Sequence, residues 1–447
     1  MNDELRSTYN EYLRYLRELV AIASISTDKT SRVGIENAFF WLESLFTDQG
    51  FIVKKLQGPE SNPVLLASYE VNAQAETILF YGHYDVQPAQ LSQGWLADPF
   101  KLRLEQNRLI ARGVVDNKGQ VLVHVATAFA QIKSGDLKYN VKFLIEGNEE
   151  TGNPDMASLL ERYKSECATD YVIISDGQII GNNPVIESTL RGGFNVRITL
   201  QTAKQDMHSG TFGGAIPNAA SVMADFLGGL IDAGNNIKYS QFYKDVDEVD
   251  VATMKSTAVL SSLTVNKTES LGVRHLTLRS GENFYYRTCL RPTIQITSLN
   301  SGYVGSGFLN SVPSTAEVRL NIRTVSSQKS AEVYRSLVEF IRKIMPSFVD
   351  YEIEVSGMHE PIKLDINSPM HVLVGEYLEK SYGEEALISF VGGAIPFVGE
   401  VKRILGKDSV LVPFANSDCN MHGPEENFSI DLVYKALTFS DMLLAKR

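Results

Sequence analysis

The chain has 447 residues, of which 44% are hydrophobic and 21% are charged, which suits a globular protein of two or three domains. Its formal net charge of −11 argues against a nucleic-acid-binding surface, because such a surface needs a basic patch. No apolar run is long enough to span a membrane, and three widely spaced cysteines indicate a reducing compartment, so we expect a cytoplasmic protein.

Helices and strands are predicted to alternate over the first 188 residues. Apolar residues at helical spacing predict helices at 1–20, 36–47 and 119–132. Short apolar runs are typical of buried strands, and they occur at 77–81, 142–145 and 171–175. Asn153 and Pro154 match the N-cap and first residue of a further helix. This alternation predicts an α/β domain with a mainly parallel sheet covered on both faces.

The pattern changes near residue 189. The stretch 194–202 alternates apolar and polar residues, as a half-exposed strand does. Further alternating strands and a helix at 330–344 complete an α+β pattern, after which helices and apolar runs of the first type return. We therefore expect an inserted α+β domain at 189–360, and a first domain formed by 1–188 and 361–447.

Candidate metal ligands stand at the ends of apolar runs and near the C-terminus. They are all His, Asp or Glu: His83, Asp85, Asp116, Glu149, Glu150, Asp176 and His422. Since the carboxyl ends of strands line the ligand crevice of an open α/β sheet, we expect most of these side chains to meet at one sheet edge. Two histidines and several carboxylates are what a pair of divalent ions about 3.5–4 Å apart requires. The pattern therefore predicts a dinuclear metal site for hydrolysis.

Five of these residues are expected to bind the ions. His83 and Asp176 would bind one ion, and Glu150 and His422 would bind the other. Asp116, on a short loop between RGVV and NKG, would bridge the two. Zn²⁺ is the expected metal, and Mn²⁺ is the alternative because carboxylate-rich sites also accept it.

The two remaining acidic residues have other expected roles. Asp85, two residues after His83, would hold the imidazole in place. Glu149 would be the general base, because a partly dry site raises the pKa of a carboxyl group toward neutrality. Paired glutamates more often lie on a solvated helix face, but this pair follows an apolar strand and stands between Gly147 and Gly152. A catalytic role is therefore the better interpretation.

Five motifs in chain order resemble the M20 family of metallopeptidases, and most closely its dipeptidase branch of carnosinase-like and cytosolic non-specific dipeptidases. They are HYDVQP, RGVVDNKG, EGNEETG, SDG and MHSG, followed by the late His422. The resemblance covers essentially the whole chain. It implies a two-metal catalytic domain with an inserted lid domain that dimerises, and the same metal, base and orienting residues as above. It also implies a cis peptide bond between Asp116 and Asn117.

His208, in DMHSG, matches a histidine of the family's lid domain. In the family this histidine reaches the active site of the partner subunit and stabilises the oxyanion of the tetrahedral intermediate. The resemblance therefore implies a homodimer in which His208 acts in trans on a small peptide substrate.

Further residues match the family's substrate-binding positions. Arg323, in LNIRTV, resembles the arginine that grips the free carboxylate of the substrate. Gly392, Gly393 and Ala394 match a loop that helps to hold this carboxylate, although close relatives often have Ser where Ala394 stands. Asn310, before SVP, is a further candidate for substrate contact.

The sequence thus predicts a metal-dependent dipeptidase that hydrolyses short peptides with a free C-terminal carboxylate. A metal-bridging hydroxide would attack the peptide carbonyl, with Glu149 as the base. One alternative is an N-acyl amino acid deacylase or desuccinylase of the same family. Another is a catalytically silent binding protein on this scaffold, which would need lost ligands, whereas every expected position is filled.

Overall fold

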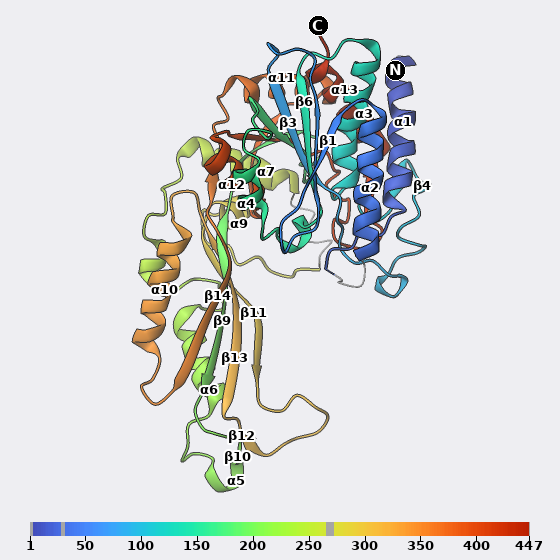
Figure 1. Ribbon diagram of the computed structural model, residues 1–447. Helices are drawn as coiled ribbons and strands as arrows, with labels where there is room; N and C mark the ends of the chain where they lie inside the picture. Colours follow the sequence, from blue (N-terminus) through green and yellow to red (C-terminus); the bar gives the residue numbers. More distant parts are fainter. Residues whose placement is uncertain (1–2, 28–31, 265–271, 447) are drawn as a thin grey trace. The chain divides into compact units, whose positions relative to one another are not determined.

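The computed structural model describes residues 3–27, 32–264 and 272–446 (Figure 1). The chain forms two compact units, and each is interrupted in sequence by the other. Unit 1 comprises Met1–Ser188, Leu364–Ser389 and Pro396–Arg447. Unit 2 comprises Thr189–Lys363 and Phe390–Ile395, so a short segment near residue 390 groups with the inserted part of the chain.

The large sheet is mixed. Its strands lie in the order β1-β2-β6-β3-β7-β17-β8-β15, with β16 beside β8. In chain order they are β1 (Ile52–Leu56), β2 (Val64–Tyr69), β3 (Thr77–His83), β6 (Asn140–Glu146), β7 (Tyr171–Ile174), β8 (Val185–Leu190), β15 (Ile362–Lys363), β16 (Leu387–Val391) and β17 (Ser409–Leu411). The central pairs β6/β3, β3/β7 and β7/β17 are parallel, whereas the pairs on either side, from β1 to β6 and from β17 to β15, are antiparallel. The α/β class is confirmed, and the predicted parallel arrangement holds for the central strands.

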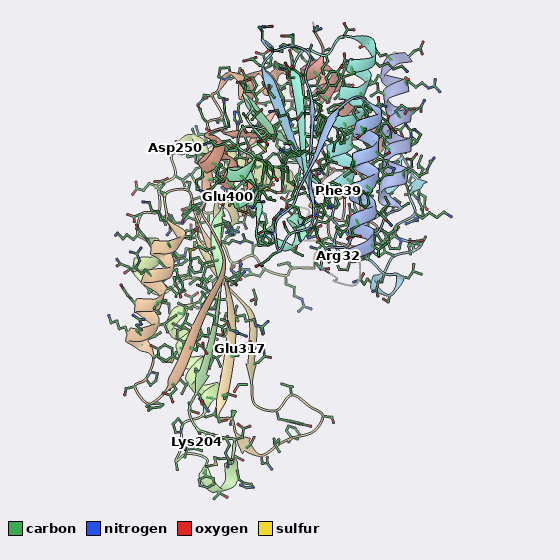
Figure 2. The ribbon with its side chains drawn as sticks, viewed as in Figure 1. Arg32, Phe39, Lys204, Asp250, Glu317 and Glu400 are labelled. Carbon is green, nitrogen blue, oxygen red and sulfur yellow. The ribbon has the colours of Figure 1, made fainter. Side chains whose placement is uncertain are left out.

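Helices cover both faces of this sheet. Neighbouring residues of a strand point to opposite faces. On β3, Phe80 stacks on His124 of α3 (Lys118–Ser134), whereas Tyr81 stacks on Phe397 of α12 (Pro396–Leu405). α1 (Asp3–Val20) and α13 (Ile430–Leu444) pack on α3, and α4 (Met156–Arg162) packs on α12. α2 (Arg32–Asp48) packs on β1 and β2, and α11 (Pro369–Tyr382) packs on α13. Phe39 of α2, labelled in Figure 2, belongs to the resulting core.

The predicted helix start at Asn153 and Pro154 is wrong. The helix α4 begins at Met156, and Asp155 precedes it. The Asn153 side chain accepts the backbone N–H of Asp155 at 3.0 Å, and its amide also donates a hydrogen bond of 2.8 Å to Oε2 of Glu146, at the end of β6. Asn153 therefore holds the turn before α4, and the helix itself begins two residues later than predicted.

Unit 2 contains an antiparallel sheet with the strand order β11-β13-β9-β14. The strands are β9 (Gly192–Gln201), β11 (Thr293–Ser301), β13 (Thr315–Thr324) and β14 (Asp350–His359). Alternate residues of β9 and β13 are buried together with residues of α6 (Ala219–Leu230) and α10 (Ser330–Ile344), and the alternate set lies on the opposite face. This is the half-exposed alternation that the sequence predicted, and α10 occupies the predicted range.

Shorter elements complete the two units. Unit 2 has a two-stranded ladder of β10 (Met207–His208) and β12 (Ser311–Val312). Between these two strands in the chain lie the helices α5 (Ser209–Phe212), η4 (Ser240–Tyr243), α7 (Val251–Thr264) and α9 (Phe284–Cys289). Unit 1 has η2 (Leu91–Gln93) and a small sheet of β4 (Arg103–Glu105), β5 (Arg108–Ile110) and β18 (Asn427–Ser429). In the part of the chain that the structure describes, no helix is both long and apolar enough to cross a membrane.

Candidate metal centre

The candidate ligands stand at the carboxyl ends of neighbouring strands. β3 ends at His83, which is level with Glu146, the last residue of β6, in the parallel register of the two strands. Glu149 and Glu150 follow in a short 3-10 helix, η3 (Glu149–Thr151), and Asp176 lies two residues after β7. The parallel centre of the sheet therefore brings these loops to one edge.

Asp116 lies between two groups of ligand atoms. Its Oδ1 is 3.0 Å from Nε2 of His83, and the same nitrogen is 3.6 Å from Oδ2 of Asp176. Its Oδ2 is 2.7 Å from Nε2 of His422, and that nitrogen is 3.4 Å from Oε2 of Glu150. Within each group of three residues, the ligand atoms lie within 4.8 Å of one another. The arrangement therefore has the form of a carboxylate bridge between two metal-binding groups.

The charges around these groups suit divalent cations. Burial raises the pKa of Asp116, but hydrogen bonds with His422 and His83 outweigh burial and hold this pKa below its usual range. The bond to Asp116 in turn raises the pKa of His422 to about 9. Carboxylates that attract protons onto imidazoles also attract divalent ions, and imidazole with carboxylate is a donor set that Zn²⁺ and Mn²⁺ accept. The residues therefore fit two divalent ions.

The loop that carries Asp116 is held by a buried ion pair that sequence reasoning missed. Glu426 is fully buried, and its Oε1 accepts hydrogen bonds from the backbone N–H groups of Val115, at 2.9 Å, and Asp116, at 3.1 Å. Its Oε2 lies 2.6 Å from Nη1 of Arg112, and Nη2 of the same arginine donates to the backbone oxygen of His422 at 3.0 Å. Glu426 and Arg112 thus fix the bridging aspartate and the C-terminal histidine together.

The peptide bond between Asp116 and Asn117 is cis, as the resemblance implied. The Asn117 side chain donates a hydrogen bond of 2.7 Å to the backbone oxygen of Ser175, the residue before Asp176. The loop of the bridging residue is therefore tied to the strand end that carries another ligand.

Asp85 contacts His83 as expected, and it also holds the paired glutamates. The backbone oxygen of Asp85 lies 3.0 Å from Nδ1 of His83, and its carboxylate Oδ1 is 3.4 Å from the same nitrogen. Both carboxylate oxygens accept backbone N–H groups at 3.2 Å, one from Glu149 and one from Glu150. Gln87, which sequence reasoning did not single out, donates to Oε2 of Glu150 at 2.7 Å.

Glu149 lies beside the ligand groups without belonging to either. Burial raises the pKa of its carboxyl group well above the usual value, and the nearby charge of His83 opposes this shift. Behind it, the buried Glu146 accepts hydrogen bonds from the Tyr81 hydroxyl and the Asn153 amide, and burial raises its pKa to about 7. Glu146 directly follows the predicted strand at 142–145 and opens the same EGNEE motif, but sequence reasoning did not single it out.

His208 and Asn310 lie together in unit 2. His208 pairs with Ser311 across the β10–β12 ladder, and the backbone N–H of Ser209 donates to the oxygen of Asn310 at 2.9 Å. The Nδ1 atom of His208 is 3.3 Å from the Thr211 hydroxyl, and the His208 side chain is exposed. The structure therefore places His208 on β10 and Asn310 directly before the adjoining strand β12.

Arg323 and the loop of Gly392, Gly393 and Ala394 also belong to unit 2. Arg323 lies on β13 and is half-buried. The loop is held by Arg191, a residue that sequence reasoning missed. Its Nε donates to the Gly392 oxygen at 2.8 Å, and its backbone N–H donates to the Gly393 oxygen at 3.1 Å.

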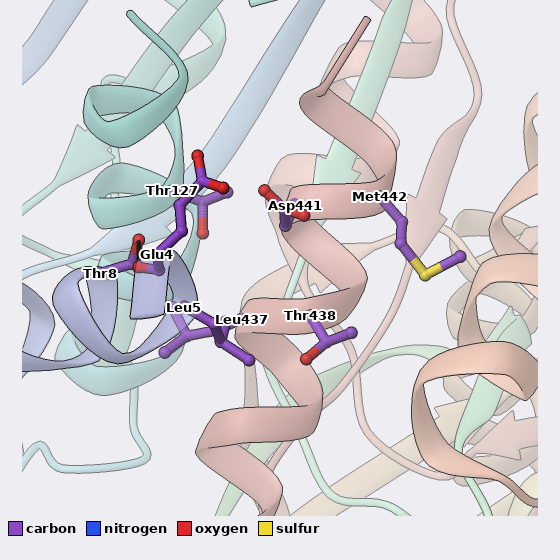
Figure 3. A pocket seen from close by; sticks show the side chains of 8 residues that line it. All are labelled: Glu4, Leu5, Thr8, Thr127, Leu437, Thr438, Asp441 and Met442. Atoms are coloured by element: carbon purple, nitrogen blue, oxygen red, sulfur yellow. Dashed lines mark hydrogen bonds between the residues drawn. The ribbon is translucent and has the colours of Figure 1, made fainter. Parts of the chain in front are cut away.

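A separate cavity of about 270 Å³ lies between α1, α3 and α13 in unit 1. Figure 3 shows that side chains from these three helices line it, among them Thr8, Thr127 and Asp441. None of the predicted metal, catalytic or substrate-binding residues borders it. This cavity is therefore distinct from the candidate metal centre.

The sequence model of peptidase family M20/M25/M40 matches residues 79–446. The chain belongs to this family. The match includes both groups of candidate ligands, Glu149, and the residues of unit 2 discussed above. This M20 peptidase is therefore an enzyme of the hydrolase class, and its family includes a solved dinuclear metal-binding peptidase, the YXEP protein of Bacillus subtilis.

Relatives of this M20 peptidase match almost its whole length. A cysteinylglycine-S-conjugate dipeptidase of Corynebacterium striatum is 28% identical over 92% of this chain and 90% of its own. The Beta-Ala-His dipeptidase of Homo sapiens is 28% identical over 93% of this chain and 82% of its own. The solved structure of the M20 family metallo-carboxypeptidase Sso-CP2 from Sulfolobus solfataricus has a TM-score of 0.86 at 28% identity, covering 99% of this chain and 98% of its own.

Proposed function

We propose that this M20 peptidase is a metal-dependent dipeptidase acting on short peptides with a free C-terminal carboxylate. The observation that carries the proposal is the position of Asp116, which offers one carboxylate oxygen to each of two histidine-containing ligand groups. Glu149 lies beside these groups as a free acid–base residue. The names of the two dipeptidase relatives support the substrate class.

Five residues would hold the metals. His83, Asp116 and Asp176 would form one site, and Asp116, Glu150 and His422 would form the other. Two divalent ions bound there supply Lewis-acid activation of the peptide carbonyl and of water. Zn²⁺ is the expected metal, with Mn²⁺ as the alternative, because the set combines imidazole with carboxylate donors.

Glu149 would move the proton during hydrolysis. Its raised pKa suits a carboxyl group that accepts a proton from the attacking water and then donates it to the leaving amine nitrogen. Asp85 supports this role, because its carboxylate holds the backbone N–H of Glu149 while its backbone oxygen holds Nδ1 of His83. The base and a metal ligand are thus positioned by one residue.

Unit 2 would supply the groups that bind the substrate. Arg323 and the loop of Gly392, Gly393 and Ala394 would hold the C-terminal carboxylate, with Asn310 as a further contact. His208 would stabilise the oxyanion in the active site of the partner subunit of a homodimer. Cys167, Cys289 and Cys419 are buried and form no disulfide, which supports a cytoplasmic location.

A product-resolved hydrolysis assay tests this proposal. We expect the enzyme, loaded with Mn²⁺ or Zn²⁺, to cleave dipeptides with a free carboxylate and to leave their C-amidated counterparts intact, because the amide removes the charge that Arg323 would bind. N-acetyl and N-succinyl amino acids complete the panel. Turnover of these acylated substrates alone would replace the dipeptidase proposal with the deacylase alternative.

The role of His208 in trans leads to a complementation experiment. His208→Ala and Glu149→Ala should each be nearly inactive, because each removes one component from every site. When the two proteins are mixed and allowed to exchange subunits, up to about a quarter of wild-type activity should return, since about half of randomly assorted dimers are mixed and each mixed dimer has one complete site. Native mass spectrometry verifies the exchange. Proven exchange without recovery would contradict action in trans.

A further inference from the structure

One row of residues crosses the four-stranded sheet of unit 2 near the start of β9. In the antiparallel registers, Arg323 of β13 lies opposite both Thr293 of β11 and Gly193 of β9, and His359 of β14 lies opposite Gly193. Directly opposite residues project from the same face of a sheet. Gly193 has no side chain, so Arg323 and His359 are the side chains on either side of it in this row.

Arg191 joins this row from the residue before β9. Its Nη1 lies 3.4 Å from the hydroxyl of Thr293, the cross-strand neighbour of Arg323. Burial above all, with a smaller contribution from the nearby positive charge of Arg323, lowers the pKa of Arg191 to about 10. Arg191 and Arg323 are therefore both neighbours of Thr293, and Arg191 also holds the loop of Gly392 and Gly393.

Other arginines on the same sheet face have carboxylate partners. Arg197 of β9 pairs with Glu354 of β14, and Arg319 of β13 lies 2.9 Å from Glu317, which is labelled in Figure 2. Arg323 is on the same face, because it is four residues from Arg319 along the strand. The sheet thus neutralises its arginines in the middle of the strands and leaves the end near Gly193 positively charged.

Among the described residues, no carboxylate forms an ion pair with Arg191 or Arg323. Asp247 lines the same cavity of about 40 Å³ as Arg191, but it does not pair with it. The protein uses Nε and Nη1 of Arg191, and Nη2 has no partner in the described part of the chain. Buried charges are normally paired, so two neighbouring unpaired guanidinium groups indicate a site for anions.

We infer that this site selects substrates that carry two carboxylates, namely dipeptides with Asp or Glu as the C-terminal residue. The inference rests on the proposed dipeptidase function. The terminal carboxylate would bind Arg323, and the side-chain carboxylate would accept from Nη2 of Arg191. A single carboxylate leaves one guanidinium charge unbalanced, whereas two carboxylates match the two charges. Arg191 is then a specificity-determining residue as well as a support of the loop.

Matched substrates test this inference. For the wild-type enzyme we expect kcat/KM for Ala-Glu to exceed that for the isosteric Ala-Gln by roughly 10-fold or more, mainly through a lower KM. The same order should hold for Ala-Asp over Ala-Asn. Arg191→Gln should remove most of this preference, and Arg191→Lys should restore part of it, because lysine keeps the charge but not the fork of donors.

Arg197→Gln is the matched control, since Arg197 lies on the same sheet face but is already paired with Glu354. It should leave the Ala-Glu to Ala-Gln ratio unchanged. Equal kcat/KM for the two substrates in the wild type would overturn the inference. An equal loss of kcat/KM on both substrates in a folded Arg191→Gln protein would also overturn it, because that result would show that Arg191 only supports the loop.

A binding measurement separates this inference from the dipeptidase proposal. In isothermal titration calorimetry of the metal-loaded wild-type enzyme, L-glutamate should bind more tightly than L-glutamine by roughly 10-fold. If no dipeptide is cleaved but glutamate is preferred, the proposed function fails and the dicarboxylate site stands. If dipeptides are cleaved and glutamate is not preferred, the dicarboxylate site fails and the proposed function stands.

Discussion

Replacing Glu149 by Gln should lower kcat by roughly 100- to 10,000-fold, the range that a general acid–base residue contributes. Glutamine keeps the size of the side chain but replaces the carboxylate with an amide, which cannot take a proton from water. Glu149 belongs to neither group of candidate ligands, so the variant should still bind about two divalent ions per chain. Steady-state kinetics together with metal analysis by mass spectrometry measure both quantities on the same sample.

Glu150→Gln is the matched control, because Glu150 is the neighbouring residue and a candidate ligand at the His422 site. It should lose metal as well as activity, whereas Glu149→Gln should lose activity alone. The assay should also be run across neutral pH, because the raised pKa of Glu149 places its titration above that of an ordinary glutamate. A Glu149→Gln enzyme with near wild-type kcat would move the acid–base role to another residue.

The loops of the metal centre were predictable from local sequence because strand ends are marked locally. Short apolar runs that end in polar residues and glycines indicate buried strands, and parallel strands place their carboxyl ends at one edge. That rule predicted that His83 and Asp176 would meet, and they share one ligand group although they are far apart in the chain. Helix α10 occupies its predicted range because its apolar residues repeat at helical spacing.

Contacts between distant segments were not predictable in this way. Glu426 binds the backbone of Asp116, 310 residues away, and Arg191 binds Gly392, 201 residues away. Neither residue lies in a periodic pattern that points to its partner. The antiparallel outer strands of the large sheet were missed for the same reason, since the sequence of a short strand does not indicate whether its neighbour runs parallel or antiparallel to it. The start of α4 was predicted two residues too early, because Asn153 holds a turn before the helix and its amide also contacts the distant strand residue Glu146.

Asp116 links the two metal groups, so its replacement should have a larger effect than the loss of any other single ligand. Asp116→Ala should empty both sites, because its Oδ1 faces His83 and its Oδ2 faces His422. His422→Ala should weaken mainly one of the two ions, since only the second group contains His422. Activity should fall below detection in Asp116→Ala, because both ions are needed to activate water and carbonyl.

Equilibrium dialysis with Zn²⁺ or Mn²⁺ separates these outcomes. Loss of a residue that only orients a metal ligand lowers metal affinity by roughly 10- to 100-fold. In Asp116→Ala the affinity of the protein for each of the two ions should fall by more than this. His422→Ala should keep close to one ion per chain, and circular dichroism should verify that both variants are folded. Two tightly bound ions in Asp116→Ala would contradict the bridging role. Loss of a single ion would assign Asp116 to one site, and some other group would then have to hold the metals together.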